Sequence, residues 1–456
     1  DDVRRIARAL FARHTTDTWG WCAACQLAVP ATTRVDDGAV WLQRECPVHG
    51  RSDALQSRHP HLHRWMEVLL PPLREPRLDH DIGGGGGDGG DGGVGGGGEP
   101  GEVGEADDVR GVFIDLTERC NLQCPNCLTD ANAPPSAEPP TLAATLDALR
   151  TLLPRRPVVY LGGGEPTLLP DLLEYVAGLA RAGYQVKLLT NGLALRDPHL
   201  CEALRDAGVC WVLLQFDSQR EEALVALRGR RGLAEVRRQV LDNLVAVGLG
   251  IDLACMIDRQ HNLSDMGALL RLGFSTPGVR HVSFMPSRRI GRGLLTDDSN
   301  LLDEVDMMRA IEAQTDGAVR PKDWMTFFTL MSAMYRLTRS PDLAPRRCFL
   351  PLALVGDADR FGPVTRPGPL LRNPGNVRAL LSALPRGGRV EAARGDERLL
   401  LTSIETFREP DTIDLGDAAR CSRWYLVDGK LRQACIHNVT GRPVDRQRRH
   451  GQARPL

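Results

Sequence analysis

The sequence predicts an α/β fold, a partial (β/α)6 barrel with a small N-terminal module and a C-terminal extension. Two observations predict it. From residue 109 onward, short β-rich runs alternate with amphipathic helical patterns, and a glycine-rich run at 83–98 separates this part from the N-terminus. Alternating strands and helices favour a parallel sheet covered by helices. Because six strands can be found, we expect a partial barrel rather than a closed barrel of eight.

The strand candidates share a high content of β-branched and aromatic residues. They are VFIDL (112–116), VVYL (158–161), VKLL (186–189), WVLLQF (211–216), IDLACM (251–256) and HVSFM (281–285). Between the fourth and fifth, Leu233, Val236, Val240, Leu244 and Val247 recur at steps of three and four. That spacing places them on one face of a helix.

Four regions follow from these patterns. Residues 1–78 form the N-terminal module, and residues 79–108 form a linker whose glycines have few side chains to bury. Residues 109–300 form the barrel. Beyond residue 300 the alternation weakens, so 301–456 is expected to be a C-terminal region of its own.

Composition narrows the functional class. The chain has 456 residues, 42% of them hydrophobic, and a net charge of −1, which predicts a globular protein without a nucleic-acid partner. No apolar run reaches the roughly 18 residues of a membrane span, so no transmembrane segment and a cytoplasmic location are expected. Since the cytosol keeps thiols reduced, the 12 cysteines favour metal or cluster binding over disulfides.

Three of these cysteines follow the first strand candidate. Cys120, Cys124 and Cys127 form a C-x3-C-x2-C array. Three thiolates at this spacing can ligate three irons of a [4Fe–4S] cluster and leave the fourth iron open. The alternative is a closed zinc site with a remote fourth ligand, but the position at the C-terminal mouth of a β/α barrel favours an active site.

The second strand candidate runs into LGGGEPTLLPDL. Gly163 and Gly164 would let the backbone approach a ligand closely, and the Glu165 carboxylate could accept hydrogen bonds from an ammonium group. Such a turn is by itself often only a loop. About forty residues after the cysteine array, at the end of the next strand, it indicates a site.

Together these motifs resemble the radical S-adenosylmethionine (SAM) superfamily over roughly residues 109–300. The resemblance implies that a [4Fe–4S] cluster, reduced by a donor such as ferredoxin or flavodoxin, cleaves SAM to a 5′-deoxyadenosyl radical that abstracts hydrogen from an unactivated C–H bond. It also implies that Gly163, Gly164 and Glu165 contact the methionine end of SAM. The residues that it places in the SAM and substrate pocket or on its rim are Thr190, Asn191, Gly192, Gln215, Phe216, Asp217, Asn262 and Arg292. For Asp217 and Asn262, a capping or turn role is the alternative. No catalytic side chain is assigned beyond the cluster ligands.

The N-terminal module carries its own ligand pattern. Cys22 and Cys25 form one knuckle, and Cys46 and His49 form a second about twenty residues later. This spacing is typical of a zinc ribbon or a rubredoxin-like site holding one zinc or iron ion. Buried cysteines without metal are the alternative.

The remaining cysteines are less informative. Cys201, Cys210 and Cys255 lie within helix or strand patterns and are expected in the core. Three more, Cys348, Cys421 and Cys435, are too widely separated for their spacing to decide between buried free thiols and ligands.

The order of motifs along nearly the whole chain resembles the tetraether lipid synthase subfamily and its hydroxymethylpterin methyltransferase-like relatives. This implies an auxiliary iron–sulfur cluster, here on Cys348, Cys421 and Cys435 with one ligand missing. It also implies a lipid substrate and C–C bond formation. The alternatives are a peptide maturase, a pterin-type methylase, and a non-catalytic iron–sulfur or electron-transfer protein.

Overall fold

The computed structural model describes residues 14–35, 38–71, 109–133, 139–295, 300–340, 343–371 and 398–441. The predicted linker, 79–108, lies outside the described residues.

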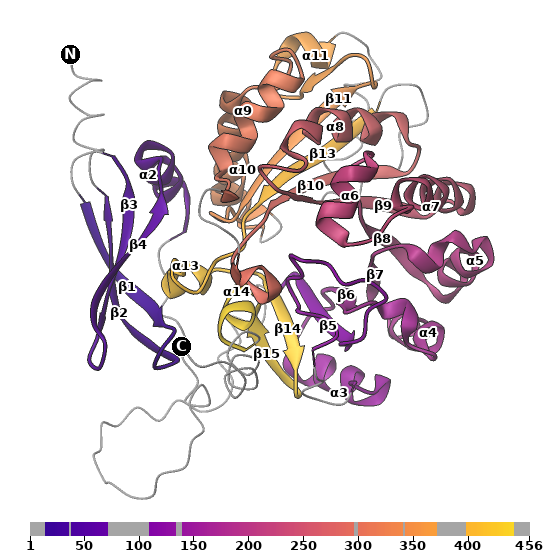
Figure 1. Cartoon of the computed structure of the whole chain (residues 1–456), viewed down its shortest axis with the longest axis horizontal. Helices are drawn as coiled ribbons and strands as arrows, with labels where there is room; N and C mark the ends of the chain where they lie inside the picture. The colour runs from indigo at the N-terminus through magenta and orange to yellow at the C-terminus, as the bar shows by residue number, and fades with distance from the viewer. Residues whose placement is uncertain are drawn as a thin grey trace, which may run out of the picture.

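The N-terminal module is a four-stranded antiparallel sheet followed by one helix (Figure 1). Its elements are β1 (His14–Cys22), β2 (Leu27–Val35), β3 (Val40–Cys46), β4 (Gly50–Ser57) and α2 (Pro60–Leu69). Each strand pairs with the next along the chain. The turns β1–β2 and β3–β4 therefore lie at the same end of the sheet.

Six parallel strands form the centre of a second sheet, in chain order from one side to the other. They are β5 (Gly111–Thr117), β6 (Val158–Gly163), β7 (Gln185–Thr190), β8 (Val209–Gln215), β9 (Gly250–Ile257) and β10 (Val279–Pro286). Each overlaps one of the six expected runs, so the prediction of a partial (β/α)6 barrel is confirmed.

Helices cover the outer face of these strands, as Figure 1 shows for α4, α5 and α7. The helices between the strands are α3 (Leu142–Leu152), α4 (Leu172–Arg181), α5 (Pro198–Ala207), α6 (Glu221–Arg228), α7 (Leu233–Val247) and α8 (Met266–Ser275). Alternate strand residues such as Ile114 and Leu214 pack with Val176 and Leu244 of the helices in one hydrophobic core. The helix expected from the periodicity of Leu233 to Val247 is α7.

The chain after residue 300 extends the same sheet at both edges. Its elements are α9 (Glu304–Gln314), α10 (Pro321–Thr338), β11 (Phe349–Gly356), β12 (Phe361–Pro363), α11 (Pro367–Leu371), β13 (Arg398–Glu405), α13 (Leu415–Ala418), β14 (Arg423–Val427), β15 (Lys430–Gln433) and α14 (Ala434–Ile436). Strand β13 runs parallel to β10, and β14 runs parallel to β5. The described C-terminal strands thus flank the six-stranded barrel on either side.

The N-terminal sheet packs against the C-terminal residues around α13 and α14 (Figure 1). Trp21, 1% exposed, shares a hydrophobic cluster with Leu415, Cys435 and Val439. The Thr33 hydroxyl also donates to the Asp414 carboxylate. The two ends of the described chain are therefore joined by packing and hydrogen bonds.

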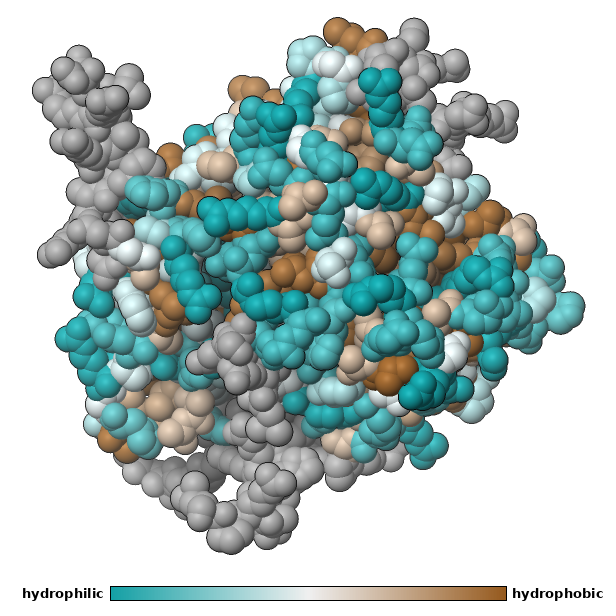
Figure 2. Space-filling model, turned by 45° about the horizontal axis from the view of Figure 1, so that its top comes forward, coloured by the Kyte–Doolittle hydropathy of each residue, from teal (hydrophilic) through white to brown (hydrophobic). Residues whose placement is uncertain are grey.

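Within the described ranges, every helix is too short or too polar to cross a bilayer. On the face drawn in Figure 2, hydrophobic residues form small patches among hydrophilic ones.

Candidate active site and metal centres

The cysteine array occupies the loop that follows β5. Cys124 is buried, and Cys120 and Cys127 are partly exposed. Asn132 holds the loop in shape: its Oδ1 accepts the Cys120 N–H at 2.7 Å, and its Nδ2 donates to the carbonyls of Cys120 and Leu122 at 3.0 and 3.2 Å. One amide side chain therefore satisfies three backbone groups that a loop would otherwise leave to water.

Arg292, which follows β10, binds the cysteine loop through hydrogen bonds and an ion pair. Its guanidinium donates to the Cys124 carbonyl at 2.9 Å and to the carbonyl of Ala131, and pairs with Asp130 at 3.0 Å. Its backbone N–H donates to the Cys127 carbonyl at 2.9 Å. The structure thus places Arg292 on the cysteine loop itself.

The glycine turn after β6 lies directly against the start of the cysteine loop. Gly164 N–H donates to the Thr117 carbonyl at 2.6 Å, and Glu165 N–H donates to the Arg119 carbonyl at 2.8 Å. A Cβ on Gly164 would lie 2.1 Å from the Arg119 oxygen, and Gly163 has φ +107°. Glycine is therefore required because this turn packs closely against the cysteine loop. The sequence had instead suggested a close approach of the turn to a ligand.

Glu165 is fully buried and links the ends of β6 and β7. Its Oε1 accepts from the hydroxyls of Thr167 and Thr190 at 2.6 and 2.7 Å, and its Oε2 accepts the Asn191 N–H at 2.8 Å. Burial raises the pKa of Glu165, and these hydrogen bonds oppose the rise. Asn191 in turn donates to Asn121 at 2.7 Å within the cysteine loop. Glu165 therefore orders the loop that carries Asn191.

Asp217, at the end of β8, forms a fully buried ion pair. Its two oxygens accept from the Nε and Nη2 atoms of Arg228, both at 2.6 Å, and Oδ1 also accepts the Met256 N–H at 2.9 Å. Burial alone would raise the pKa of Asp217, but the charges of Arg228 and Arg237 hold it below its ordinary value. These contacts favour an internal role for Asp217.

Arg237, on α7, is a functional candidate that the sequence analysis missed. Its side chain is 2% exposed, and none of its three guanidinium nitrogens has a hydrogen-bond partner among the residues that the structure describes. Its nearest counter-charge is Asp217, at 3.8 Å, and burial lowers its pKa to about 10. A buried guanidinium without hydrogen bonds is costly unless an anion completes it.

Asn262 also has an internal role among the described residues. Its Oδ1 accepts the Asp258 N–H at 2.7 Å, and its Nδ2 donates to the carbonyls of Asp217 and Met256, both at 2.8 Å. It therefore caps the turn after β9, which is the alternative that the sequence left open.

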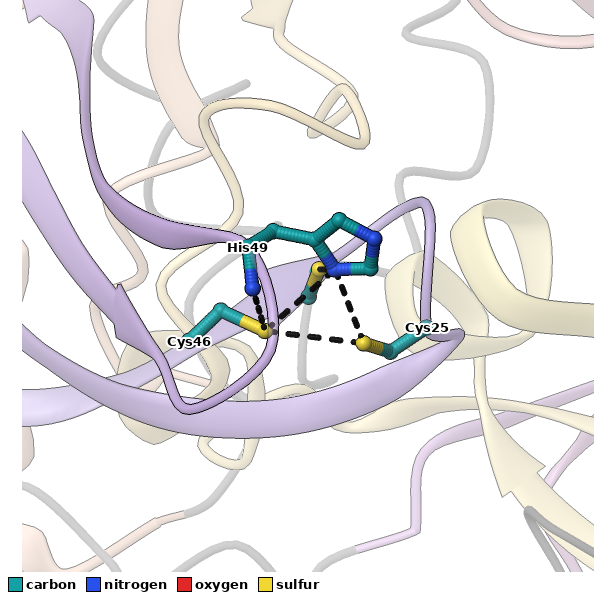
Figure 3. A group of neighbouring side chains, drawn as sticks. Cys25, Cys46 and His49 are labelled. Atoms are coloured by element: carbon teal, nitrogen blue, oxygen red, sulfur yellow. Dashed lines mark hydrogen bonds between the residues drawn. The ribbon is translucent and has the colours of Figure 1, made fainter.

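The two knuckles of the N-terminal module converge on one point (Figure 3). The donor atoms of Cys22, Cys25, Cys46 and His49 all lie within 4.8 Å of one another. His49 presents Nδ1, at 3.0 Å from the Cys25 sulfur. The backbone N–H groups of His49 and Val48 lower the pKa of Cys46 to about 6, although burial opposes them. These four donors fit a tetrahedral ion.

Cys348, Cys421 and Cys435 line one pocket, although they lie far apart in the sequence. Burial raises the pKa of Cys348 to about 12, which disfavours a free thiolate there. The other residues that line this pocket are Arg346, Arg347, Arg408, Asp417, Ala418 and Arg420. Among the described residues, only the N-terminal group has three or more such donors close enough for a single metal ion.

Of the three cysteines expected in the core, two are buried and one is exposed. Cys201 and Cys255 are fully buried, so that prediction is confirmed for them. The prediction is wrong for Cys210. Val209 pairs with Val186 and Trp211 pairs with Lys187, which leaves Cys210 as the extra residue of a β-bulge.

Comparison with known families gives two matches. Residues 114–272 match the model of the radical SAM superfamily. Residues 14–58 match the HMPTM N-terminal zinc ribbon domain. The first range covers the cysteine array, and the second covers the four N-terminal metal donors.

Two curated relatives are similar over part of the chain. A 7,8-dihydro-6-hydroxymethylpterin dimethyltransferase from Methanocaldococcus jannaschii is 27% identical over 67% of this chain and 60% of its own. A PqqA peptide cyclase from Gluconobacter oxydans is 29% identical over 46% of this chain and 60% of its own. The chain thus spans about three-fifths of each relative.

Among solved structures, SuiB of Streptococcus suis bound to the precursor peptide SuiA is similar with a TM-score of 0.39. The two are 16% identical, and the match covers 46% of each chain.

Proposed function

This chain is a member of the radical SAM superfamily, and we propose that it cleaves SAM reductively at a [4Fe–4S] cluster on Cys120, Cys124 and Cys127 and abstracts hydrogen from a substrate C–H bond. The observation that carries the proposal is the cysteine loop, which Asn132, Arg292 and the glycine turn hold at the C-terminal mouth of the barrel. A cluster with three protein ligands supplies an electron and an open iron for SAM.

The residues around the loop fit this group. Three thiols come from one short segment, and the carbonyls of Cys120, Cys124 and Cys127 are all engaged by Asn132 or Arg292. The loop is thereby shaped before any cluster binds, which reduces the entropy lost on binding.

The test is anaerobic reconstitution with iron and sulfide, followed by dithionite and SAM, with 5′-deoxyadenosine measured by mass spectrometry. Deoxyadenosine that depends on the cluster supports the proposal. A protein with a formed cluster and bound SAM that yields none, with or without substrate, would instead support the non-catalytic alternative.

We expect the guanidinium of Arg237 to form charge-assisted hydrogen bonds with the carboxylate of SAM. Charge-assisted hydrogen bonds contribute about 1.5–3 kcal/mol, so Arg237→Met should weaken SAM binding by roughly ten- to a hundredfold. Isothermal titration of the reconstituted protein with SAM measures this. The control is Arg238→Met, because Arg238 is 65% exposed on the same helix and pairs there with the acidic side chains of Glu235 and Asp242. Equal SAM affinity in wild type and Arg237→Met would contradict the assignment.

The C-terminal pocket is proposed to hold an auxiliary cluster on Cys348, Cys421 and Cys435. Four arginines line it and would offset the negative charge of such a cluster, while Asp417 pairs with Arg408 at 2.9 Å and Arg420 at 3.1 Å. No fourth cysteine lines this pocket in the part of the chain described.

The content of acid-labile sulfide measures the number of iron–sulfur clusters. A mononuclear ion in the N-terminal module contains no sulfide and does not contribute to it. With two [4Fe–4S] clusters, the reconstituted protein should contain about eight sulfides per chain, and a variant with all three C-terminal cysteines changed to alanine about four. Cys210→Ala, which removes an exposed thiol, should keep eight. About four sulfides in the wild type would exclude the auxiliary cluster.

For the substrate, a polar molecule is favoured by the inner face of the barrel, where Asp115, Lys187, Gln215 and Glu405 lie on strand positions that point away from the helices. This supports the pterin-type alternative, and the similar dimethyltransferase is named for such a substrate. The lipid and peptide substrates, the ferredoxin or flavodoxin donor, the choice between zinc and iron in the N-terminal module and a cytoplasmic location stay predictions.

A further inference from the structure

The inner face of the barrel is accessible, whereas the outer face is sealed by helices. Outward positions such as Ile114, Leu161 and Leu214 are fully buried. Inward positions at the same level, among them Leu189 and Leu213, are partly exposed. Because side chains alternate between the faces of a strand, this pattern marks a solvent-accessible inner surface.

A charged and aromatic layer lies deep on this inner face. Lys187 lies 5.7 Å from the ring centre of Tyr160 and 5.2 Å from that of Trp211, and it pairs with Asp252 at 2.6 Å. The three residues stand side by side on β6, β7 and β8. A substrate would therefore lie between this layer and the cysteine loop, on the C-terminal halves of the strands.

Glu405, the last residue of β13, is partly exposed at that level. Its Oε1 accepts hydrogen bonds from the hydroxyls of Ser283 at 2.7 Å and Ser403 at 2.8 Å. Its Oε2 accepts no hydrogen bond, and no ion pair joins it to a cation, within the residues that the structure describes. One carboxylate oxygen is thus fixed in place while the other remains available.

The hydrogen bonds behind Glu405 fix its orientation further. The Ser403 hydroxyl donates to Glu405, so it must accept from the Nε2 of His281, which lies 2.8 Å away. Burial lowers the pKa of His281. Because the Ser403 hydroxyl has already given its hydrogen to Glu405, the nearby Nε2 of His281 carries a proton. His281 therefore donates to Ser403, and the hydroxyls of Ser403 and Ser283 both donate to Glu405.

We propose that Glu405 selects the substrate: through Oε2 it binds the exocyclic amino group of a polar nitrogen heterocycle, as on the amino-pyrimidinone edge of a pterin. A carboxylate held by two hydroxyls can only accept, so it favours a ligand rich in N–H donors. An alkyl chain at this position would remove water from the Glu405 carboxylate without offering a hydrogen bond in its place, which is unfavourable. This inference rests on the proposed function and assigns the substrate class of the same site.

Two ligands that differ in the exocyclic amino group test it: 6-hydroxymethyl-7,8-dihydropterin and its lumazine analogue, in which a carbonyl oxygen replaces the 2-amino group and ring N1 carries a hydrogen. Isothermal titration uses the reconstituted holoenzyme with SAM bound. The wild type should bind the pterin at least about tenfold more tightly than the analogue, and Glu405→Gln should lose that preference. Glu174→Gln, an exposed change on α4, is the matched control and should keep it.

Retention of the preference in Glu405→Gln would overturn the inference, and so would a wild type that binds neither ligand or does not distinguish them. The cluster absorbance and the circular dichroism spectrum show whether the variant is folded. Deoxyadenosine formation by the wild type reports separately on the proposed function. If the protein forms deoxyadenosine but does not bind the pterin more tightly than the analogue, the inference about Glu405 is wrong and the proposed function still stands.

Discussion

Cys124→Ala is expected to reduce deoxyadenosine formation to background. Cys124 is the most buried of the three loop cysteines, at 7% exposed, and packs among Leu122, Leu193 and Leu224. With two thiols left, the loop cannot hold a cluster by three irons. The measurement is deoxyadenosine by mass spectrometry, together with iron and sulfide content after anaerobic reconstitution.

The matched control is Cys210→Ala. This thiol is exposed at a bulge of β8, so its removal should leave deoxyadenosine formation at the wild-type level. If Cys124→Ala keeps wild-type turnover, the assignment of the cluster to this loop is wrong.

Asp217→Ala is expected to destabilise the fold by about 3–5 kcal/mol, because it leaves Arg228 buried without its counter-charge. Arg228 and Asp217 are 2% and 0% exposed, and both oxygens of the carboxylate are bonded to the guanidinium. Anaerobic urea unfolding of wild type and variant measures the difference in the free energy of unfolding.

An exposed pair provides the comparison. Asp206 pairs with Arg205 at 2.8 Å with side chains 68% and 46% exposed, so Asp206→Ala should cost no more than about 1 kcal/mol. A loss of similar size in both variants would refute the buried ion pair as the cause.

The same pair predicts a pH dependence with a definite sign. The folded pKa of Asp217 lies below its ordinary value, so its contribution is complete above the unfolded pKa of about 3.9. It is lost as the pH falls through the folded pKa. The difference in stability between wild type and Asp217→Ala should therefore be constant at neutral pH and shrink only in strong acid.

Much of the site could be predicted because its signals are local in the sequence. The cysteine loop, the glycine turn and the two N-terminal knuckles each lie within a few residues, and metal-ligand chemistry restricts their spacing. The six strands were recognisable because each is a short run rich in β-branched, aromatic and other apolar residues between helical patterns.

The role of Asp217 was left open, and Arg228 and Arg237 were missed, because arginine is common in this chain and its position carries no pattern. Only their complete burial on α6 and α7, around one carboxylate, distinguishes them from the exposed Arg238. The structural feature that identifies them is two buried cations beside one anion. The sequence does not reveal it, because residue type alone does not show which arginines are buried.

The sequence by itself determined the local motifs, since the three thiols and the glycine turn each lie within a few residues, and it determined the partial barrel through strand and helix periodicity. Tertiary structure alone decided what is non-local. It brought Cys348, Cys421 and Cys435 to one pocket, and placed Glu405 of a C-terminal strand beside Ser283 of the barrel. The physical reason is that ligands within one loop share a local conformation, whereas residues on distant strands meet only through the pairing of β13 with β10 and β14 with β5.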